Sequence, residues 1–142
     1  MKIHIITVGS PKLSYAKDGW QEYFQRLGHY HQLRVTHIAD KHNDTAHLLD
    51  AASNGYKVAM VIEGKQFSSP DLSAWLDKRA LDGREICFII GGPEGLPQEV
   101  IDASDYRWSL SQLTLPHDLA MVFLLETLYR ASTISAGQPY HK

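Results

Sequence analysis

Hydrophobic positions along the chain fall into short continuous runs separated by stretches with helical spacing. Runs rich in Ile and Val cover residues 2–8, 58–62 and 86–90, and a turn sequence follows each of them. Such runs predict strands, and the last two are typical of strands buried on both faces of a parallel sheet. Two further strands are expected, at residues 33–39 and 108–110.

Between the runs, apolar residues recur at steps of three and four, which predicts amphipathic helices. Helix starts are indicated by Asn43 or Asp44 as caps, and by the Ser69-Pro70-Asp71 sequence. Helices are therefore expected at residues 13–27, from the cap to 52, from 69 onward, at 97–103 and at 118–134. Alternating strands and helices predict one α/β domain, residues 1–142, with a mostly parallel sheet and helices on both faces.

The composition is that of a globular protein. The 142 residues are 44% hydrophobic and 21% charged, which suffices for a substantial core. The single Cys87 excludes a disulfide scaffold, favours a reducing compartment and is expected to be a buried core residue. No apolar run approaches the ~18 residues of a membrane span, and no signal peptide is indicated. We therefore expect a cytoplasmic protein.

The net charge of −2 is a poor global signature for a nucleic-acid binder, so an RNA contact would need a local basic patch. One candidate exists at the end of the chain. No acidic residue follows Glu126, whereas Arg130, His141 and Lys142 do. This segment is either a solvated tail or a nucleic-acid contact.

Three segments follow strand ends in the second half of the chain: Ile62–Lys65, Gly91–Leu96 and Leu110–Leu115. Ligands of open α/β sheets bind beyond the carboxyl ends of the strands, so these segments are candidates for one pocket. Neither a P-loop nor a G-x-G-x-x-G sequence is present. The segment 110–116 carries no charge, which suits an uncharged heterocycle such as adenine, or else it is a plain turn into the last helix.

Other chemistries have less support in the sequence. His37, His42 and His47 recur at intervals of five, which does not place them on one helical face, so no metal site is expected. A G-x-S-x-G elbow is absent, which argues against a serine hydrolase. Residue patterns alone leave the reaction unnamed.

The second half of the chain contains a specific set of motifs. They indicate a resemblance to a known family that extends over nearly the whole chain. They are Phe88-Ile89-Ile90-Gly91-Gly92-Pro93-Glu94-Gly95-Leu96, Trp108-Ser109-Leu110-Ser111, Leu113-Thr114-Leu115-Pro116-His117, Glu126, Leu128-Tyr129-Arg130-Ala131, Ile134 and Pro139-Tyr140-His141. Together they closely resemble the RlmH family, the large-subunit rRNA pseudouridine N3-methyltransferases of the SPOUT class.

The resemblance implies an α/β fold whose C-terminal part forms a deep trefoil knot, an exception to the usual rule. It implies a homodimer that binds S-adenosylmethionine in the knot. The substrate it implies is N3 of a pseudouridine in the helix-69 loop of 23S rRNA, on the assembled ribosome. Family cofactor contacts carry over to Ile62, Gly91, Leu110, Ser111, Gln112, Leu113, Thr114 and Leu115. Gly91 is expected to let the backbone approach the ligand closely.

The same resemblance directs attention to two histidines and the basic tail. His117 and His141 are candidate general bases for the N3 proton, although a structural contact at the helix start is an equal alternative for His117. Tyr140 is expected at the catalytic centre as a stacking platform for the target base. Arg130, Tyr140, His141 and Lys142 are the expected RNA contacts.

The last helix is more apolar than one core-facing stripe requires, so part of it is expected to pack on a second subunit. The residues concerned are Leu119, Val122, Phe123, Leu125 and Tyr129.

The chain departs from the family pattern at three places. The turn at Glu63-Gly64 is one residue short, Met121 stands where Arg is usual, and Lys142 replaces another Arg. Loss of a cation at Met121 predicts weaker RNA or cofactor binding. These departures leave a second hypothesis open, a ribosome-associated RNA-binding protein without catalysis. A small-molecule enzyme that uses another nucleotide would need the phosphate loop that is missing.

Overall fold

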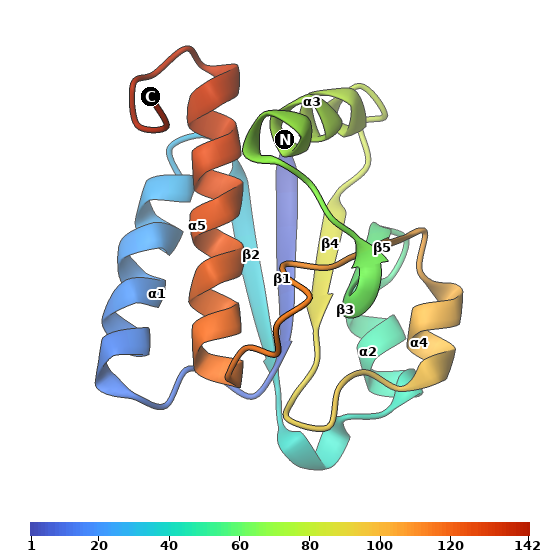
Figure 1. The fold of residues 1–142 in the computed structure, drawn as a ribbon. Coiled ribbons are helices and arrows are strands. Elements are labelled where there is room, and N and C mark those ends of the chain that lie inside the picture. The colour runs from blue at the N-terminus through green and yellow to red at the C-terminus, as the bar shows by residue number, and fades with distance from the viewer.

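The computed structural model describes residues 1–142 and contains one five-stranded sheet (Figure 1). Its order is β2-β1-β4-β3-β5, and all four neighbouring pairs are parallel. The strands are β1 (Lys2–Val8), β2 (Gln32–Ile38), β3 (Tyr56–Lys65), β4 (Ile86–Ile90) and β5 (Tyr106–Trp108). The predicted parallel α/β architecture is confirmed.

Helices cover both faces of this sheet, as predicted. They are α1 (Ser14–Leu27), α2 (Thr45–Ala52), α3 (Ser69–Ala80), α4 (Gln98–Ala103) and α5 (His117–Ser135), with a short 3-10 turn η1 (Asp40–His42). The larger core joins one sheet face to α1, α3 and α5, and a smaller core joins the other face to α2 and α4. None of the helices combines the length and apolar character that crossing a bilayer requires.

The central strands are buried on both faces, which explains their continuous apolar runs. All five residues of β4 are buried, including Cys87, which lies in the core as expected. In β1, Ile3 and Ile5 pack into the larger core, whereas Ile6 and Val8 pack into the smaller one. Because the strands are packed on both faces, the carboxyl ends of β1, β3 and β4 are held in fixed positions at one edge of the sheet.

Several predicted boundaries are wrong by one to three residues, and contacts in the structure explain three of these differences. The strand β3 continues to Lys65, where a turn was expected, because β5 pairs with it a second time: the Ser109 N–H donates to the Lys65 carbonyl at 2.8 Å. That pairing also places β5 at residues 106–108 rather than 108–110. The cap of α3 is Ser68 rather than Ser69, since its hydroxyl accepts from the Asp71 N–H at 3.1 Å.

The segment that leaves β5 returns across the sheet. Figure 1 shows residues 109–116 running from the β5 edge to the start of α5, which lies beside α1. The chain then follows α5 away from this edge, and the C-terminus lies at its far end (Figure 1). The loop and the tail are therefore at opposite ends of one helix.

Candidate functional site

A cavity of about 220 Å³ lies beyond the carboxyl ends of β3 and β4. The three segments predicted to share a pocket form its walls. Of the predicted cofactor residues, those that line it are Ile62, Gly91, Leu110, Ser111, Leu113, Thr114 and Leu115. Gln112 is the exception: it is exposed and does not line the cavity. Residues from three separate strand ends, up to 53 positions apart, thus meet in one hollow.

The glycine loop after β4 folds closely on itself. A Cβ placed on Gly91 would lie 2.6 Å from the Gly95 carbonyl carbon and 2.9 Å from the Leu96 nitrogen. The loop is closed by a hydrogen bond from the Gly95 N–H to the Gly92 carbonyl at 2.9 Å, and Gly95 has a φ of +80°. The loop's own backbone therefore requires glycine at position 91, and the close approach to a ligand expected from the sequence stays a prediction.

The loop between β5 and α5 is held by its own small hydroxyl groups. The Ser109 hydroxyl donates to the Ser111 carbonyl at 2.9 Å, and the Ser111 hydroxyl accepts from the Leu113 N–H at 3.0 Å. No Lys, Arg, Asp or Glu side chain lines the cavity. Such walls suit a heterocycle recognised by backbone groups and offer nothing to neutralise a phosphate.

One cavity residue has an unpaired polar atom. His117 is the first residue of α5, and its Nε2 is buried without a hydrogen-bond partner. The ring lies near Gly9, whose Cβ, if present, would be 3.7 Å from Nε2. Buried polar atoms ordinarily find a partner, and this nitrogen is the one buried side-chain polar atom of the cavity lining that lacks one.

The next residue explains how this helix start is held. Asp118 is buried, and its Oδ2 accepts hydrogen bonds from the backbone N–H groups of Lys12, at 2.9 Å, and Leu13, at 2.7 Å. The Leu13 bond is the main cause of a lowered Asp118 pKa. The carboxylate therefore ties the beginning of α5 to the beginning of α1, and it fixes His117 beside the cavity.

The predicted RNA contacts Arg130, Tyr140, His141 and Lys142 lie together at the other end of α5. The helix has 19 residues, so its ends are about 28 Å apart. The structure thus separates the two candidate bases: His117 is at the cavity, whereas His141 contacts Arg130, 13 residues or about 20 Å further along the same helix.

The tail packs against its own subunit. The Tyr140 hydroxyl donates to Glu126 at 2.9 Å, and its ring meets the Tyr129 ring edge-on at 4.7 Å. Burial, followed by hydrogen bonds to Tyr23 and Glu126, raises the Tyr140 pKa well above its ordinary value, so this phenol stays neutral. Arg130 is paired with Glu126 at 2.8 Å, which raises its pKa further. Its guanidinium is therefore occupied by internal contacts, a feature that the sequence reasoning missed.

Two departures from the family pattern lie outside the cavity lining. Met121 is fully buried in the larger core, so the predicted loss of a cation from a binding surface at this position is wrong. Gly64 lies within β3, where a Cβ would meet the backbone of Arg107 and Trp108 at 2.7 Å. The shortened Glu63-Gly64 segment is therefore part of the strand that pairs with β5, not a turn beside the cavity.

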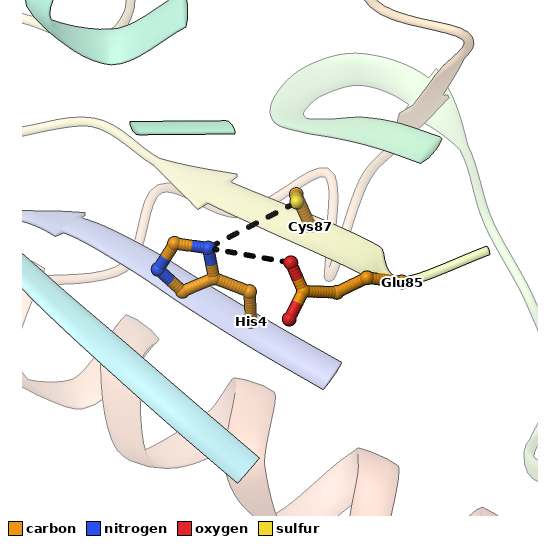
Figure 2. Close-up of side chains that lie close together, drawn as sticks. All are labelled: His4, Glu85 and Cys87. Carbon is orange, nitrogen blue, oxygen red and sulfur yellow. Dashed lines mark hydrogen bonds and ion pairs between the residues drawn. The ribbon is translucent and has the colours of Figure 1, made fainter. Parts of the chain in front are cut away.

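A group of metal-ligating residue types lies in the core and was missed in the sequence (Figure 2). His4 Nδ1 is 4.0 Å from both Glu85 Oε1 and Cys87 Sγ, because His4 and Cys87 are register partners of β1 and β4. Burial raises the Cys87 pKa to about 11, and Arg34 pairs with Glu85 at 2.7 Å. The thiolate that a metal would require is therefore disfavoured, and the carboxylate already has a cationic partner.

A second such group is at the surface. The Asp44 carboxylate caps α2 and accepts from both the backbone and the ring of His47, whose ring stacks on His42 at 4.2 Å. The positive end of a helix dipole disfavours a cation at this point. His37, the third histidine of the series, is instead hydrogen-bonded to Thr7 at 2.6 Å. The absence of a metal stays a prediction.

Comparison with known proteins identifies the family. A family model described as "Predicted SPOUT methyltransferase" matches residues 1–141. The "Ribosomal RNA large subunit methyltransferase H" of Deinococcus deserti is 52% identical over 145 residues, and the match covers the whole of both chains. The chain belongs to the RlmH family of SPOUT methyltransferases. The protein of the same name from Deinococcus radiodurans is 48% identical, and the match covers all of this chain and 99% of the relative.

Solved structures agree on the fold. A probable methylase family protein from Haemophilus influenzae superposes with a TM-score of 0.64 at 11% identity, covering 99% of this chain and 70% of that chain. A putative methylase family protein from Neisseria gonorrhoeae gives a TM-score of 0.58 at 12% identity, over 90% of this chain and 81% of that one. At such identities the likeness concerns the fold alone. Membership of the SPOUT class also supports the expected C-terminal knot.

Proposed function

We propose that this protein is an S-adenosylmethionine-dependent methyltransferase that methylates N3 of a pseudouridine in the helix-69 loop of 23S rRNA. The names of the relatives support the coarser statement, a methyltransferase of large-subunit ribosomal RNA. The resemblance supports the finer one. A ribosomal substrate also agrees with the cytoplasmic location expected from the sequence.

The convergence of three strand-end segments on one uncharged cavity is the observation that carries this proposal. Ile62, Gly91 and the loop from Leu110 to Leu115 would hold the cofactor, with Gln112 contributing only through its backbone. When bound, S-adenosylmethionine supplies a methyl group already activated by a sulfonium. The chain itself must bind and orient the cofactor and the target base, and it must exclude water. Positioning of this kind contributes up to roughly 7–11 kcal/mol.

The cavity residue best placed to move a proton is His117. His117 lines the cavity, its Nε2 has no hydrogen-bond partner, and a neutral imidazole is an effective base near pH 7. We assign it the N3 proton of the target base, a step that typically contributes 10²–10⁴-fold. Its alternative role as a contact at the helix start is filled by Asp118, which has the hydrogen bonds that His117 lacks.

The RNA contacts require a second subunit. Because His141 contacts Arg130, which is 13 residues or about 20 Å along α5 from the cavity residue His117, we propose that Tyr140, His141 and Lys142 serve the cavity of the partner in a homodimer. Tyr140 would stack on the splayed target base, and Lys142 would contact phosphates. A dimer thus provides the basic surface that a net charge of −2 does not.

Fewer α5 residues are free to contact a partner subunit than the sequence indicated. Of the five α5 residues expected to meet a partner, Leu125 is fully buried in its own core and Tyr129 packs on Tyr23. Leu119 is 37% exposed, and Leu13, at the start of α1, is 57% exposed. These two side chains and Tyr15 form the apolar surface that we assign to the partner.

Methyl transfer to ribosomes that lack the modification tests the proposal. Cofactor with a labelled methyl group should yield label in 23S rRNA, and mapping should place it on a helix-69 pseudouridine. Label elsewhere would overturn the substrate assignment. Binding of S-adenosylmethionine in calorimetry without any transfer would favour the second hypothesis, an RNA-binding protein without catalysis. That hypothesis has lost its main support, because Met121 and Gly64 lie outside the cavity lining.

A further inference from the structure

The C-terminal tail carries a hydrogen-bond chain that fixes the state of one histidine. Glu126 and Arg130 are one turn apart on α5, and the guanidinium Nε and Nη2 both donate to Glu126 Oε2, at 3.1 Å and 2.8 Å. The remaining Nη1 points to His141 Nδ1 at 3.3 Å. The Glu126 carboxylate thus orients the Arg130 guanidinium, which in turn is hydrogen-bonded to the His141 imidazole.

Tyr140 holds this chain of contacts in place. Its hydroxyl donates to the same Glu126 oxygen at 2.9 Å, and its ring lies beneath Arg130, whose Cζ is 4.8 Å from the ring centroid. The guanidinium is therefore clamped between a carboxylate and an aromatic face. Its side chain is only 30% exposed, and Glu126 is 24% exposed, so solvent competes weakly for these bonds.

The direction of the last hydrogen bond follows from chemistry. A guanidinium has five N–H donors and no acceptor, so Nδ1 of His141 must accept from Arg130. A neutral imidazole has one protonated nitrogen and one acceptor nitrogen. With Nδ1 as the acceptor, the proton is on Nε2, and His141 presents an N–H group to whatever the tail touches.

We propose that Glu126 and Arg130 are positioning residues that present His141 as a hydrogen-bond donor to a carbonyl oxygen of the target base, not as its general base. This inference rests on the proposed function. N3 of the base lies between two carbonyl groups, so the charge left when N3 loses its proton spreads onto their oxygens. A neutral N–H donor aimed at one of them stabilises that charge as it develops.

The two histidines then have different roles. The N3–H bond breaks and the proton passes to His117 Nε2, while the new N3–carbon bond forms at the expense of the sulfonium–carbon bond. His141 of the partner subunit exchanges no proton. It donates to the oxygen that carries the charge, and Arg130 keeps its second nitrogen from acting as a base.

Nitrogen NMR of the intact protein with ¹⁵N-labelled histidine tests the first half of this proposal without cofactor or ribosome. His141 should show a protonated Nε2 and an unprotonated Nδ1, and the His141→Ala spectrum supplies the assignment. The Nδ1 signal should shift in Arg130→Gln. A protonated Nδ1 would overturn the inference even if the protein proves to be a methyltransferase.

Kinetics on ribosomes tests the second half. His141→Ala should lower kcat by about 10²-fold, whereas His141→Gln, which keeps an N–H near the position of Nε2, should restore most of the loss. A general base would show no such rescue, so equal loss in both variants would overturn the proposal. Glu126→Gln should lower kcat but leave cofactor affinity unchanged. Glu22→Gln, which removes the same i,i+4 pairing with Arg26 on α1, is the matched control and should have no effect. If the wild-type protein transfers no methyl group, the proposed function fails, and the NMR result alone decides the state of His141.

Discussion

Asp118 and Leu13 are joined by a 2.7 Å hydrogen bond from the Leu13 N–H to the Asp118 Oδ2, although 105 positions separate them in the chain. A second bond, from the Lys12 N–H, ends on the same oxygen. Asp118 is buried, so loss of its carboxylate would leave two backbone donors without a partner. The cavity residue His117 is adjacent, which makes this contact relevant to the site as well as to stability.

Replacement of Asp118 should therefore destabilise the fold. We expect Asp118→Ala to lower the free energy of unfolding by about 3 kcal/mol, because hydrogen bonds to a charged group contribute more than neutral ones. Urea unfolding measures this change. Asp118→Asn keeps an acceptor oxygen and should lose less. Asp18→Ala, at an exposed position of α1, is the control, and equal effects at the two aspartates would contradict this explanation.

Acid should weaken the protein through buried histidines. Burial and the nearby N-terminal ammonium lower the His31 pKa to about 4, below its ordinary value of 6.5. The unfolded chain then binds a proton at a higher pH than the folded one does, so the stability that His31 contributes is lost as the pH drops from 6.5 to 4. His4 and His37 shift in the same direction, chiefly through burial.

The size of this loss is measurable by unfolding at several pH values. After allowance for the partial solvent exposure of His31, we expect it to contribute about 1–2 kcal/mol between pH 6.5 and pH 4. The His31→Gln variant should show a shallower pH dependence. An unchanged slope in that variant would assign the acid sensitivity to other groups.

Much of the fold was predictable because it depends on local pattern. The run from Ile86 to Ile90 has no polar residue, and such a run is stable only in a strand covered on both faces. The spacing in α5 likewise predicts a long helix. Segment ends were less predictable, because the extension of β3 to Lys65 depends on its pairing with Trp108, 43 positions later.

The site was predictable in part for a related reason. Parallel strands end at one edge of a sheet, so Ile62 and Gly91 had to approach each other once the strands were recognised. The contacts of the C-terminal tail could not be predicted in this way. The spacing of Glu126 and Arg130 is a visible i,i+4 pair, but the return of the tail depends on Gly137, whose φ is +70°. The contact of Tyr23 with Tyr140 spans 117 positions.

Ile62 offers a test of the cavity that leaves the core intact. Its side chain is 48% exposed at the cavity wall, where the cofactor that we propose would cover it. Ile62→Ala should weaken S-adenosylmethionine binding about tenfold, the equivalent of ~1.4 kcal/mol of apolar contact, with little change in thermal stability. Leu81→Ala, at an 86% exposed position outside the cavity, is the control. Calorimetry that shows the same affinity for both variants would move the ligand elsewhere.

Gly91→Val should have a different outcome from Ile62→Ala. Because its Cβ would lie 2.6 Å from the Gly95 backbone, we expect loss of cofactor binding together with a lower melting temperature. Gly83→Ala is the comparison, since a Cβ there meets nothing and only the φ of +71° costs energy. Loss of binding with wild-type stability would mean that the loop tolerates the side chain and the ligand does not.

The tail provides the sharpest test of a site shared between subunits. Removal of His141 and Lys142 keeps the packing of Tyr140 on Tyr129, so stability and cofactor affinity should be unchanged while methyl transfer is lost. A protein with Ile62→Trp, which fills the cavity, should also be inactive. When the two inactive proteins are mixed and allowed to exchange subunits, each mixed dimer regains one complete site, with an open cavity from one chain and an intact tail from the other. Recovery of up to about a quarter of the wild-type activity is expected, because half of the dimers are mixed and each has one working site of two. No recovery, in a mixture that sedimentation shows to contain dimers, would place the tail in the site of its own chain and contradict the proposal of a shared site.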